Sequence, residues 1–327
     1  MRFGVIGAGR IGKIHGANIA ARRDCELRYV ADADAAAARS LADATGAKVA
    51  EIEAIISAKD VDAVAICAPT DMHADLIERA ARAKKAVFCE KPVDLDADRI
   101  RRCLKVVNEA GAPLMIGFNR RFDPNFAALQ SRIAQGAVGA VEIVSITSRD
   151  PSPPPVSYIA RSGGLYRDMM IHDFDMARFL LGEEPVVLSA MGAALVDKEI
   201  GEAGDVDTAV VIVQTKSGKV AEISNSRRAT YGYDQRIEIH GAKGMLRAEN
   251  VHETTVQFAG AHGFSGDKAL NFFLERYASA YRDELAAFVR AVASGAAPSP
   301  SGEDGLRAQL LADAADRSRR TGQTVTV

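Results

Sequence analysis

The sequence contains no tryptophan, few cysteines and no long hydrophobic run. Its four cysteines form no C-x-x-C pair, and each lies in an apolar stretch. We therefore expect reduced, packed thiols, and neither disulfides nor a metal site, at Cys25, Cys67, Cys89 and Cys103. No run of about 18 apolar residues occurs, as a membrane-spanning helix would require. The N-terminal segment MRFGVIGAGRIG has too short an apolar stretch for a secretory signal, so we expect a cytoplasmic protein with no membrane partner.

An excess of charge of either sign is missing as well. The chain has 41 lysines and arginines against 43 aspartates and glutamates, for a formal net charge of -2, and the two signs are interspersed. A protein that binds DNA or RNA usually carries a clustered basic surface, so a nucleic-acid partner is not expected. With 327 residues, of which 48% are hydrophobic, the chain can bury a large core and is long enough for two domains.

The first 118 residues alternate short apolar runs with helical patterns. The apolar runs are RFGVI (2–6), ELRYVAD (26–32), DAVAICAP (62–69), AVFCE (86–90) and PLMIGF (113–118). Such alternation is typical of β-α-β units, whose parallel strands are covered by helices on both faces. We predict an α/β Rossmann domain that binds a dinucleotide over residues 1–118.

The pattern changes after residue 118. Between Val186 and Phe258, β-rich runs such as TAVVIVQT and KVAEISNS are joined by short turns such as KSGK and GAKG. Close strands with glycine turns indicate antiparallel hairpins. We predict a second, α+β domain over residues 119–327, with a largely antiparallel open sheet for substrate binding and oligomerisation, and with C-terminal helices that can pack back on the first domain. The proline-rich stretch at 151–155 is predicted to be an irregular loop.

A glycine motif follows the first predicted strand and opens a helical pattern. Glycines at these spacings permit a tight turn and a close approach of backbone amides to a pyrophosphate, while the helix N-terminus attracts negative charge. The predicted cofactor contacts in this motif are Gly7, Gly9, Arg10, Ile11 and Gly12.

An aspartate at the end of the second predicted strand indicates which dinucleotide is bound. Asp32 lies 20 residues after Gly12, where a carboxylate accepts hydrogen bonds from the adenosine ribose and repels a 2′-phosphate. The following Ala33 and Asp34 supply no arginine for such a phosphate. The sequence therefore favours NAD over NADP as the cofactor.

A charged pair, Glu90 and Lys91, lies directly before Pro92 at the end of a predicted strand. Open α/β sheets bind ligands at the carboxyl ends of their strands, so both side chains are candidates for the cofactor crevice, with the proline restricting Lys91 to extended conformations. A surface salt bridge is the alternative. Thr70 and His73 follow another strand at the same edge and are further cofactor candidates, although a helix cap and an exposed histidine explain them equally well. We expect His15, on the first helix, to face solvent.

Residues 163–182 read as one helix bounded by glycines. Asp168 and His172 are four residues apart and would share a face, with Asp175 nearly on the same side. Histidine can take a hydroxyl proton near neutral pH, and a neighbouring carboxylate can orient its ring. A metal site is the rival interpretation, but no cysteine ligand lies nearby, and we predict no metal. A helix-capping aspartate beside a satisfied histidine remains the structural alternative.

Together these motifs resemble the family of glucose-fructose oxidoreductase, inositol dehydrogenase and rhizopine-catabolism oxidoreductases. The chain has G-A-G-R-I-G at 7–12, E-K-P at 90–92 and D-x-x-x-H at 168–172 in that family's order, and the resemblance spans essentially the whole chain. Within the family the chain is most similar to the inositol dehydrogenases, on the segments FNRRFDP (118–124), TSRDP (147–151), RDMMIHDFDMARFLLGEEP (167–185) and YGYDQRIEIHG (231–241).

The resemblance implies an NAD-dependent oxidation of myo-inositol at its axial hydroxyl. In this scheme His172 is the catalytic base, Lys91 donates a hydrogen bond to the reacting hydroxyl, and Asp168 orients His172. Lys91, Asp168 and His172 would also contact substrate, together with Arg121, Asp150, Asp175, Tyr231 and Tyr233. The resemblance further implies a homotetramer. Another inositol isomer or a sugar as substrate remains an alternative, as does a non-catalytic NAD-binding regulator.

Overall fold

The computed structural model describes residues 1–327, apart from the side chain of Ala160, and it divides into two compact units. Unit 1 comprises Met1–Phe122 and Ala280–Gln309, and unit 2 comprises Asp123–Ser279 and Leu310–Val327. A segment near the C-terminus thus returns to the first unit before the chain ends in the second.

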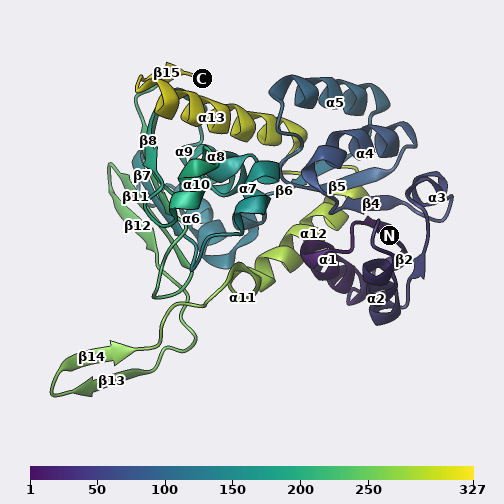
Figure 1. Cartoon of the computed structure of the whole chain (residues 1–327), viewed down its shortest axis with the longest axis horizontal. Helices are drawn as coiled ribbons and strands as arrows, with labels where there is room; N and C mark the ends of the chain where they lie inside the picture. Colours follow the sequence, from purple (N-terminus) through teal and green to yellow (C-terminus); the bar gives the residue numbers. More distant parts are fainter. The chain divides into compact units, whose positions relative to one another are not determined.

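Unit 1 contains a six-stranded, wholly parallel sheet (Figure 1). Its strands are β1 (Arg2–Ile6), β2 (Glu26–Ala31), β3 (Lys48–Val49), β4 (Ala63–Ile66), β5 (Ala86–Glu90) and β6 (Leu114–Gly117). The order β3-β2-β1-β4-β5-β6 reverses direction between β1 and β4, which is the doubly wound arrangement that binds dinucleotides at the reversal. The predicted Rossmann fold is confirmed.

Helices cover both faces of this sheet. On one face lie α1 (Arg10–Ala20), α2 (Ala35–Thr45) and α12 (Ala278–Ser294), which share one hydrophobic core with β1, β2, β4 and β5. On the other face α4 (Thr70–Arg82) packs against β4, β5 and α5 (Ala97–Ala110). The remaining helical elements of the unit are the short α3 (Ile52–Ser57) and η1 (Asn119–Phe122), together with the first part of α13 (Gly302–Thr321).

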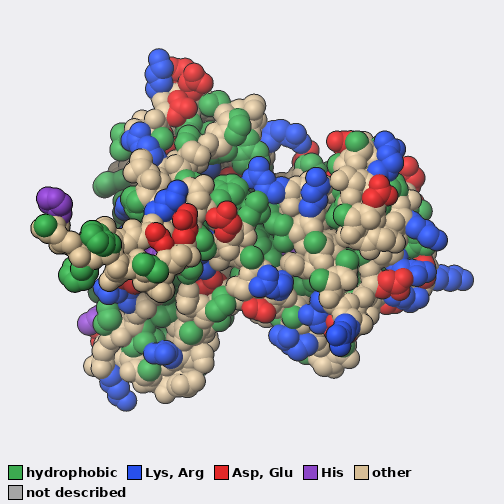
Figure 2. Space-filling model, turned by 90° about the horizontal axis from the view of Figure 1, so that it is seen from below, with side chains coloured by type: hydrophobic (Ala, Val, Ile, Leu, Met, Phe, Trp, Pro, Cys, Tyr) green, Lys and Arg blue, Asp and Glu red, His purple; other side chains and the backbone are tan. Residues whose placement is uncertain are grey.

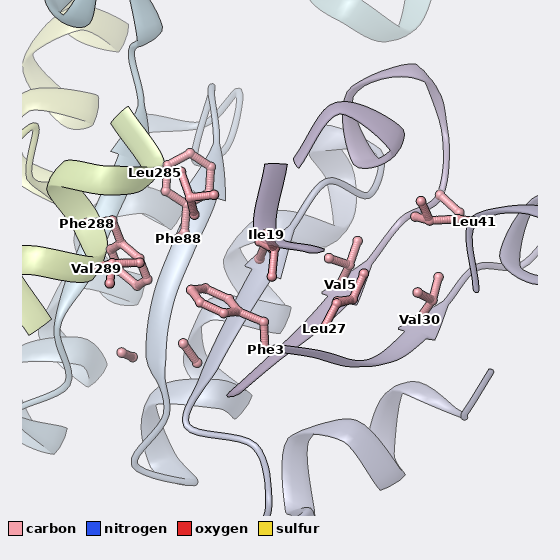
Figure 3. Packing of buried hydrophobic residues seen from close by; sticks show 14 of the residues in the cluster. Phe3, Val5, Ile19, Leu27, Val30, Leu41, Phe88, Leu285, Phe288 and Val289 are labelled. Carbon is pink, nitrogen blue, oxygen red and sulfur yellow. The ribbon is translucent and has the colours of Figure 1, made fainter. Parts of the chain in front are cut away.

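Three phenylalanines join the sheet to α12. Phe288 of α12 lies with its ring centroid 6.1 Å from that of Phe3 and 5.8 Å from that of Phe88, and all three side chains are fully buried (Figure 3). Tilted and edge-on aromatic pairs at such separations add to the energy of area burial. A helix that is distant in sequence therefore completes the core of unit 1.

Unit 2 is built on a seven-stranded sheet. The strands are β7 (Val141–Arg149), β8 (Pro185–Ala193), β9 (Thr208–Thr215), β10 (Val220–Ser226), β11 (Asp234–Gly241), β12 (Gly244–Ala248) and β15 (Val325–Thr326). Their order is β12-β11-β7-β10-β9-β8-β15, and every pair is antiparallel except β7 with β10. The predicted largely antiparallel sheet is confirmed.

The helices of unit 2 include one departure from the predicted pattern. They are α6 (Pro124–Ala134), α7 (Val156–Ser162), α8 (Gly164–Asp168), α9 (Ile171–Leu181), α10 (Lys198–Glu202), α11 (Phe273–Arg276) and the end of α13. The single helix predicted over 163–182 is wrong, because it is broken between α8 and α9. Met169 and Met170 form a turn between the two helices, and Met169, Met170 and Ile171 are all buried.

A two-stranded hairpin extends from the rest of unit 2 (Figure 1). It consists of β13 (Gln257–Gly260) and β14 (Gly263–Gly266), and its Phe258 and Phe264 are 70% and 80% exposed. Figure 2 shows hydrophobic side chains on this arm, and charges of both signs interspersed over the face that it draws. Among the described residues, none of the helices combines the length and apolar character needed to cross a lipid bilayer.

Candidate active site

The glycine loop between β1 and α1 has the geometry that a bound pyrophosphate needs. Gly7 has a φ of +100°, and a Cβ there would lie 2.5 Å from the backbone of Cys67, while a Cβ at Gly12 would lie 1.9 Å from the Gly7 carbonyl oxygen. A Cβ at Gly9 would meet nothing within 4 Å, and Gly9 caps α1 without a side-chain hydrogen bond. The amides that open α1, beginning at Arg10 and Ile11, can therefore bind phosphate oxygens.

Asp32 is fixed beside this loop at the end of β2. Its Oδ2 accepts a hydrogen bond from the Ala8 amide at 2.5 Å, and its Oδ1 accepts one from the Asp34 amide at 2.8 Å. Each carboxylate oxygen has a second lone pair, so the anchored group can still accept hydrogen bonds from ribose hydroxyls. The donors and acceptors of the loop thus fit an NAD molecule whose adenosine lies over β2.

His73 links the loops that follow β4 and β5. The imidazole is 2% exposed, with Nδ1 2.7 Å from the Pro92 carbonyl oxygen and Nε2 2.7 Å from that of Ala68. The alternative of an exposed helical histidine is therefore wrong. Thr70 is the first residue of α4, and Pro69 occupies the capping position, so the helix-cap alternative does not apply to Thr70 either.

Glu90 and Lys91 lie at the carboxyl end of β5. The Glu90 Oε1 atom is 2.7 Å from His15 Nε2, and a Cβ on the facing Gly117 would lie 3.1 Å from the Glu90 carboxyl carbon. His15 is fully buried, so its predicted exposure to solvent is wrong: the imidazole is enclosed between the strand end and α12. Lys91 is half-buried beside this pair.

Asp168 is the centre of a polar group in unit 2. Its Oδ1 accepts a hydrogen bond from the Tyr158 hydroxyl at 3.1 Å, and its Oδ2 accepts one from Arg227 Nη2 at 3.4 Å. The Nη1 atom of Arg227 lies 3.9 Å from Asp150 Oδ2. Arg227 therefore brings together two carboxylates that were both predicted to contact substrate. Tyr158 and Arg227 were not predicted from the sequence.

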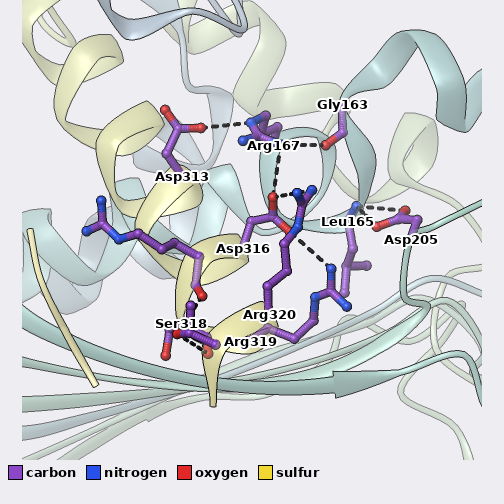
Figure 4. A network of polar contacts seen from close by, with 11 residues as sticks. Gly163, Leu165, Arg167, Asp205, Asp313, Asp316, Ser318, Arg319 and Arg320 are labelled. Carbon is purple, nitrogen blue, oxygen red and sulfur yellow. Dashed lines mark hydrogen bonds and ion pairs between the residues drawn. The ribbon is translucent and has the colours of Figure 1, made fainter. Parts of the chain in front are cut away.

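A second network holds α8, the helix that ends at Asp168, next to the final part of α13 (Figure 4). Arg167 donates from Nε to Asp313 Oδ1 at 2.8 Å, and its Nη1 lies 3.7 Å from Asp316 Oδ2. At the start of α8, both carboxylate oxygens of Asp205 accept the Leu165 amide, at 3.1 and 3.0 Å. Burial raises the pKa of Asp205. These contacts fix the backbone that carries Asp168.

His172 and Asp175 lie in the first part of α9, where His172 is half-buried and Asp175 is 1% exposed. Asp175 Oδ1 lies 3.6 Å from Arg178 Nη1, and Arg178 also binds Glu184. Because the helix is broken after α8, Asp168 and His172 belong to different helices, and their spacing of four residues does not place them on one helical face.

The remaining predicted substrate residues lie in different surroundings. Tyr231 is 46% exposed, and its hydroxyl donates to Asp234 at 2.7 Å; burial and the Asp234 carboxylate raise the Tyr231 pKa. Tyr233 is buried, edge-on to Tyr277 at 5.9 Å.

Among the predicted substrate residues, only Arg121 and Lys91 belong to unit 1. The Nη2 atom of Arg121 donates to Asp304 Oδ1 at 2.9 Å. Burial raises the pKa of Asp304. The charge of Arg121 and the hydrogen bonds from Ser301 outweigh this effect and lower the pKa to about 2. Arg121 is thus held by an ionised partner within its own unit.

Comparison with family models gives two matches that cover most of the chain. Residues 1–118 match a model described as "Oxidoreductase family, NAD-binding Rossmann fold", and residues 126–247 match the "GFO/IDH/MocA C-terminal domain". The first match covers the same residues as the predicted dinucleotide-binding domain.

Individual relatives are similar over their full length. An inositol 2-dehydrogenase of Rhizobium meliloti is 59% identical over 97% of this chain and 96% of its own. The crystal structure of a myo-inositol dehydrogenase from Corynebacterium glutamicum has a TM-score of 0.96 at 45% identity, covering 100% of this chain and 98% of its own. A scyllo-inositol dehydrogenase from Lactobacillus casei, solved with bound NAD(H) and scyllo-inositol, has a TM-score of 0.93 at 29% identity, with coverage of 100% and 98%.

Proposed function

Because the chain belongs to the GFO/IDH/MocA oxidoreductase family, we propose that it is an NAD-dependent inositol 2-dehydrogenase that oxidises myo-inositol to 2-keto-myo-inositol, or scyllo-inosose. The observation that carries this proposal is the 59% identity, over nearly the whole of both chains, to a protein named inositol 2-dehydrogenase. The glycine loop and the anchored Asp32 support NAD as the cofactor.

In the proposed reaction, the bound cofactor supplies the hydride acceptor, and the chain supplies the proton chemistry. His172 takes the proton of the reacting hydroxyl, and Lys91 donates a hydrogen bond to the same oxygen, where negative charge develops. Asp168 orients His172 and stabilises the imidazolium. The hydrogen bonds from Tyr158 and Arg227 would keep the Asp168 carboxylate in position for this role.

We propose that selectivity among polyols comes from charged and hydroxyl side chains that pair with the ring hydroxyls. The candidates are Arg121, Asp150, Asp175, Tyr231 and Tyr233. An axial hydroxyl leaves its carbon with an equatorial hydrogen, which a pocket holding the equatorial hydroxyls can direct at the nicotinamide. An isomer with one displaced hydroxyl would leave a buried polar group unpaired, at a cost of about 1 to 3 kcal/mol, or roughly tenfold or more in kcat/KM.

Steady-state kinetics with myo-inositol, scyllo-inositol, D-chiro-inositol and glucose test the substrate. We expect the highest kcat/KM with myo-inositol and no change on adding EDTA. A higher kcat/KM with glucose would reject myo-inositol as the preferred substrate without affecting the assignment to the family. Loss of activity in EDTA would reject a mechanism based on His172 and Lys91 alone.

The structural similarity to a scyllo-inositol dehydrogenase favours one alternative, oxidation of the all-equatorial isomer. The hydrogen that leaves scyllo-inositol is axial, so the ring would have to bind in a different orientation. The same panel of substrates separates the two proposals, because scyllo-inositol would then give the highest kcat/KM.

We also propose that the protein is a cytoplasmic homotetramer. One face of the sheet in unit 2 carries exposed apolar side chains on adjacent strands, a pattern that suits pairing with a second copy. These are Ile143, Met191, Val210, Ile212 and Met245. Four free cysteines suit a reducing compartment. Sedimentation equilibrium would give the mass, and substitution of Val210 and Ile212 by Lys should lower it.

A further inference from the structure

A buried cluster of three ionisable groups lies inside unit 1, behind the end of β5. His15 comes from α1, Glu90 from β5 and Glu284 from α12. His15 Nε2 is 2.7 Å from Glu90 Oε1 and 3.9 Å from Glu284 Oε1. The side chains of His15 and Glu284 are 0% exposed, whereas that of Glu90 is 13% exposed. The imidazole therefore pairs with Glu90 and has a second carboxylate nearby, in a region of low dielectric.

The two glutamates have different surroundings. Glu90 has a hydrogen-bonding partner in His15 and an edge open to solvent. Among the described residues, neither carboxylate oxygen of Glu284 has a hydrogen-bond partner. An ionised carboxylate is costly to bury without such partners, and a second negative charge nearby increases that cost. Accordingly, burial raises the pKa of Glu284 well above its usual value, and the charge of Glu90 raises it further.

The walls of the cluster are mainly aromatic. The ring of Phe88 lies 4.8 Å from the His15 ring, and that of Tyr281 lies edge-on at 5.7 Å, between centroids. The other titratable groups near the cluster are Tyr281 on α12, whose ring contacts that of His15, and the half-buried Cys67 after β4. Lys91 is the next residue after Glu90 in the chain.

The cluster adjoins the half of the crevice where the nicotinamide must lie. Asp32 places the adenosine over β2, and the N-terminus of α1 places the pyrophosphate next to β1. A dinucleotide that crosses the sheet at the reversal of strand order continues over β4 and β5. Glu90 is the last residue of β5, at the carboxyl end of the strands, and its side chain is 13% exposed.

We propose that Glu284 is a neutral, protonated acid and that Glu90 is the cluster's single negative charge, which makes the protein bind the oxidised cofactor better than it otherwise would. The oxidised nicotinamide ring is positively charged and the reduced ring is neutral, so one nearby negative charge acts on only one of the two forms. Glu284 contributes by staying neutral, so that the only negative charge of the cluster is the one on Glu90. This inference rests on the NAD dependence of the proposed function.

Equilibrium binding of NAD⁺ and NADH to the protein without substrate tests the charge assignment. We expect Glu90→Gln to lower the ratio of NAD⁺ to NADH affinity on the order of tenfold, from the Coulomb energy of unit charges roughly 10 Å apart at an effective dielectric of about 20. Glu284→Gln, which has the shape of the protonated acid, should leave the ratio unchanged at neutral pH. Asp283→Asn removes an exposed charge from the same helix and is the matched control.

The unchanged ratio expected for Glu284→Gln does not by itself show that Glu284 is protonated. Two further measurements detect the protonated acid directly. The infrared difference spectrum between wild type and Glu284→Gln at neutral pH should contain the carbonyl band of a protonated carboxylic acid. At alkaline pH the wild-type affinity ratio should rise as Glu284 ionises and adds a second negative charge, and the ratio in Glu284→Gln should lack that rise.

Other outcomes would overturn the proposal. A carboxylate band in place of the acid band would mean that Glu284 is ionised, as it would be if the three groups held a divalent cation. An unchanged ratio in a folded Glu90→Gln variant would mean that its charge does not reach the nicotinamide. Absence of binding of either cofactor to the wild type would instead reject the NAD dependence itself, so the two failures are distinguishable.

Discussion

The guanidinium of Arg227 binds the carboxylate of Asp168, with Nη2 3.4 Å from Oδ2. Arg227 is only 2% exposed, and a buried guanidinium of this kind requires a carboxylate partner to offset its loss of hydration. The orientation of Asp168 is therefore determined within unit 2, before any substrate binds. This relationship makes Arg227 a positioning residue for the proposed catalytic group.

Replacing Arg227 by Met should reduce kcat by about 10- to 100-fold, because Asp168 loses the partner that orients it. Arg227→Lys keeps the charge without the paired donors and should recover part of this loss. Arg228→Met, at the adjacent exposed arginine, is the matched control and should be close to wild type. Steady-state kinetics of the three variants provide the measurement.

A purely structural role for Arg227 would give a different result. Thermal unfolding would then show equal destabilisation in the Met and Lys variants, and kcat of the folded fraction would be normal in both. Recovery of kcat by Lys, at unchanged cofactor affinity, is the result that the positioning role requires.

Lys91→Ala should lower kcat by about 100-fold or more and leave NAD⁺ binding largely intact, since the lysine acts on the hydroxyl that develops negative charge. Single-turnover kinetics and fluorescence titration with the cofactor measure the two effects separately. Lys105→Ala removes a 77% exposed lysine from α5 and should change neither quantity. Near-normal turnover in Lys91→Ala would remove the residue from the proposed mechanism.

Asp32→Ser combined with Ala33→Arg should shift the cofactor preference toward NADP⁺. The exchange removes the carboxylate that repels a 2′-phosphate and adds a guanidinium that can bind one. The ratio of kcat/KM values for the two cofactors measures the shift, and Asp32→Ser alone shows how much of it comes from lost repulsion. If neither variant changed the ratio, the carboxylate would not contact the ribose.

The pair of Arg121 and Asp304 should make stability depend on pH in acid. The folded state lowers the pKa of Asp304 from 3.8 to about 2, so its contribution is fully present above the unfolded value and is lost as pH falls through the folded value. At neutral pH, Asp304→Asn should reduce the free energy of unfolding by about 2 kcal/mol.

The difference between wild type and Asp304→Asn should shrink between about pH 4 and pH 2, as the wild-type carboxylate takes up its proton. Denaturant unfolding at a series of pH values provides the test. Glu303→Gln, at the exposed neighbouring position on α13, is the control. It should change the free energy of unfolding by less, and by a similar amount at every pH. A constant difference down to pH 2 would contradict the lowered pKa.

The Rossmann half of the fold was predictable because its signals are local. Each strand is a short apolar run followed by a helical pattern, and the glycine loop needs only its own residues and the strand beside it. In unit 2, by contrast, the prediction named strands only from Val186 onward and omitted β7. That strand is central, and its partners β10 and β11 lie some 75 residues or more further along the chain, so its pairing has no local signature.

The candidate site was predictable as a set of residue types, and less so as a set of contacts. His15 reads as an ordinary residue of an amphipathic helix, and its burial depends on Glu90 and Glu284, which are remote in sequence. Arg227 lies in the sequence NSRRAT, where nothing distinguishes it from the exposed Arg228. The role of Arg227 depends on its ion pair with Asp168, which is distant in sequence, and the spacing of residues in the sequence does not reveal this pair.

The return of residues 280–309 to unit 1 has a consequence for how the protein is made. During synthesis the N-terminal strands leave the ribosome first, but Phe3 and Phe88 lack their aromatic partner Phe288, which follows two hundred residues after Phe88. Domains usually fold in the order in which they are translated. Here the first unit cannot reach its final packing until the second has been almost completely translated, so the nascent chain carries a sheet that still lacks α12 on one face, where a chaperone could shield the exposed apolar residues.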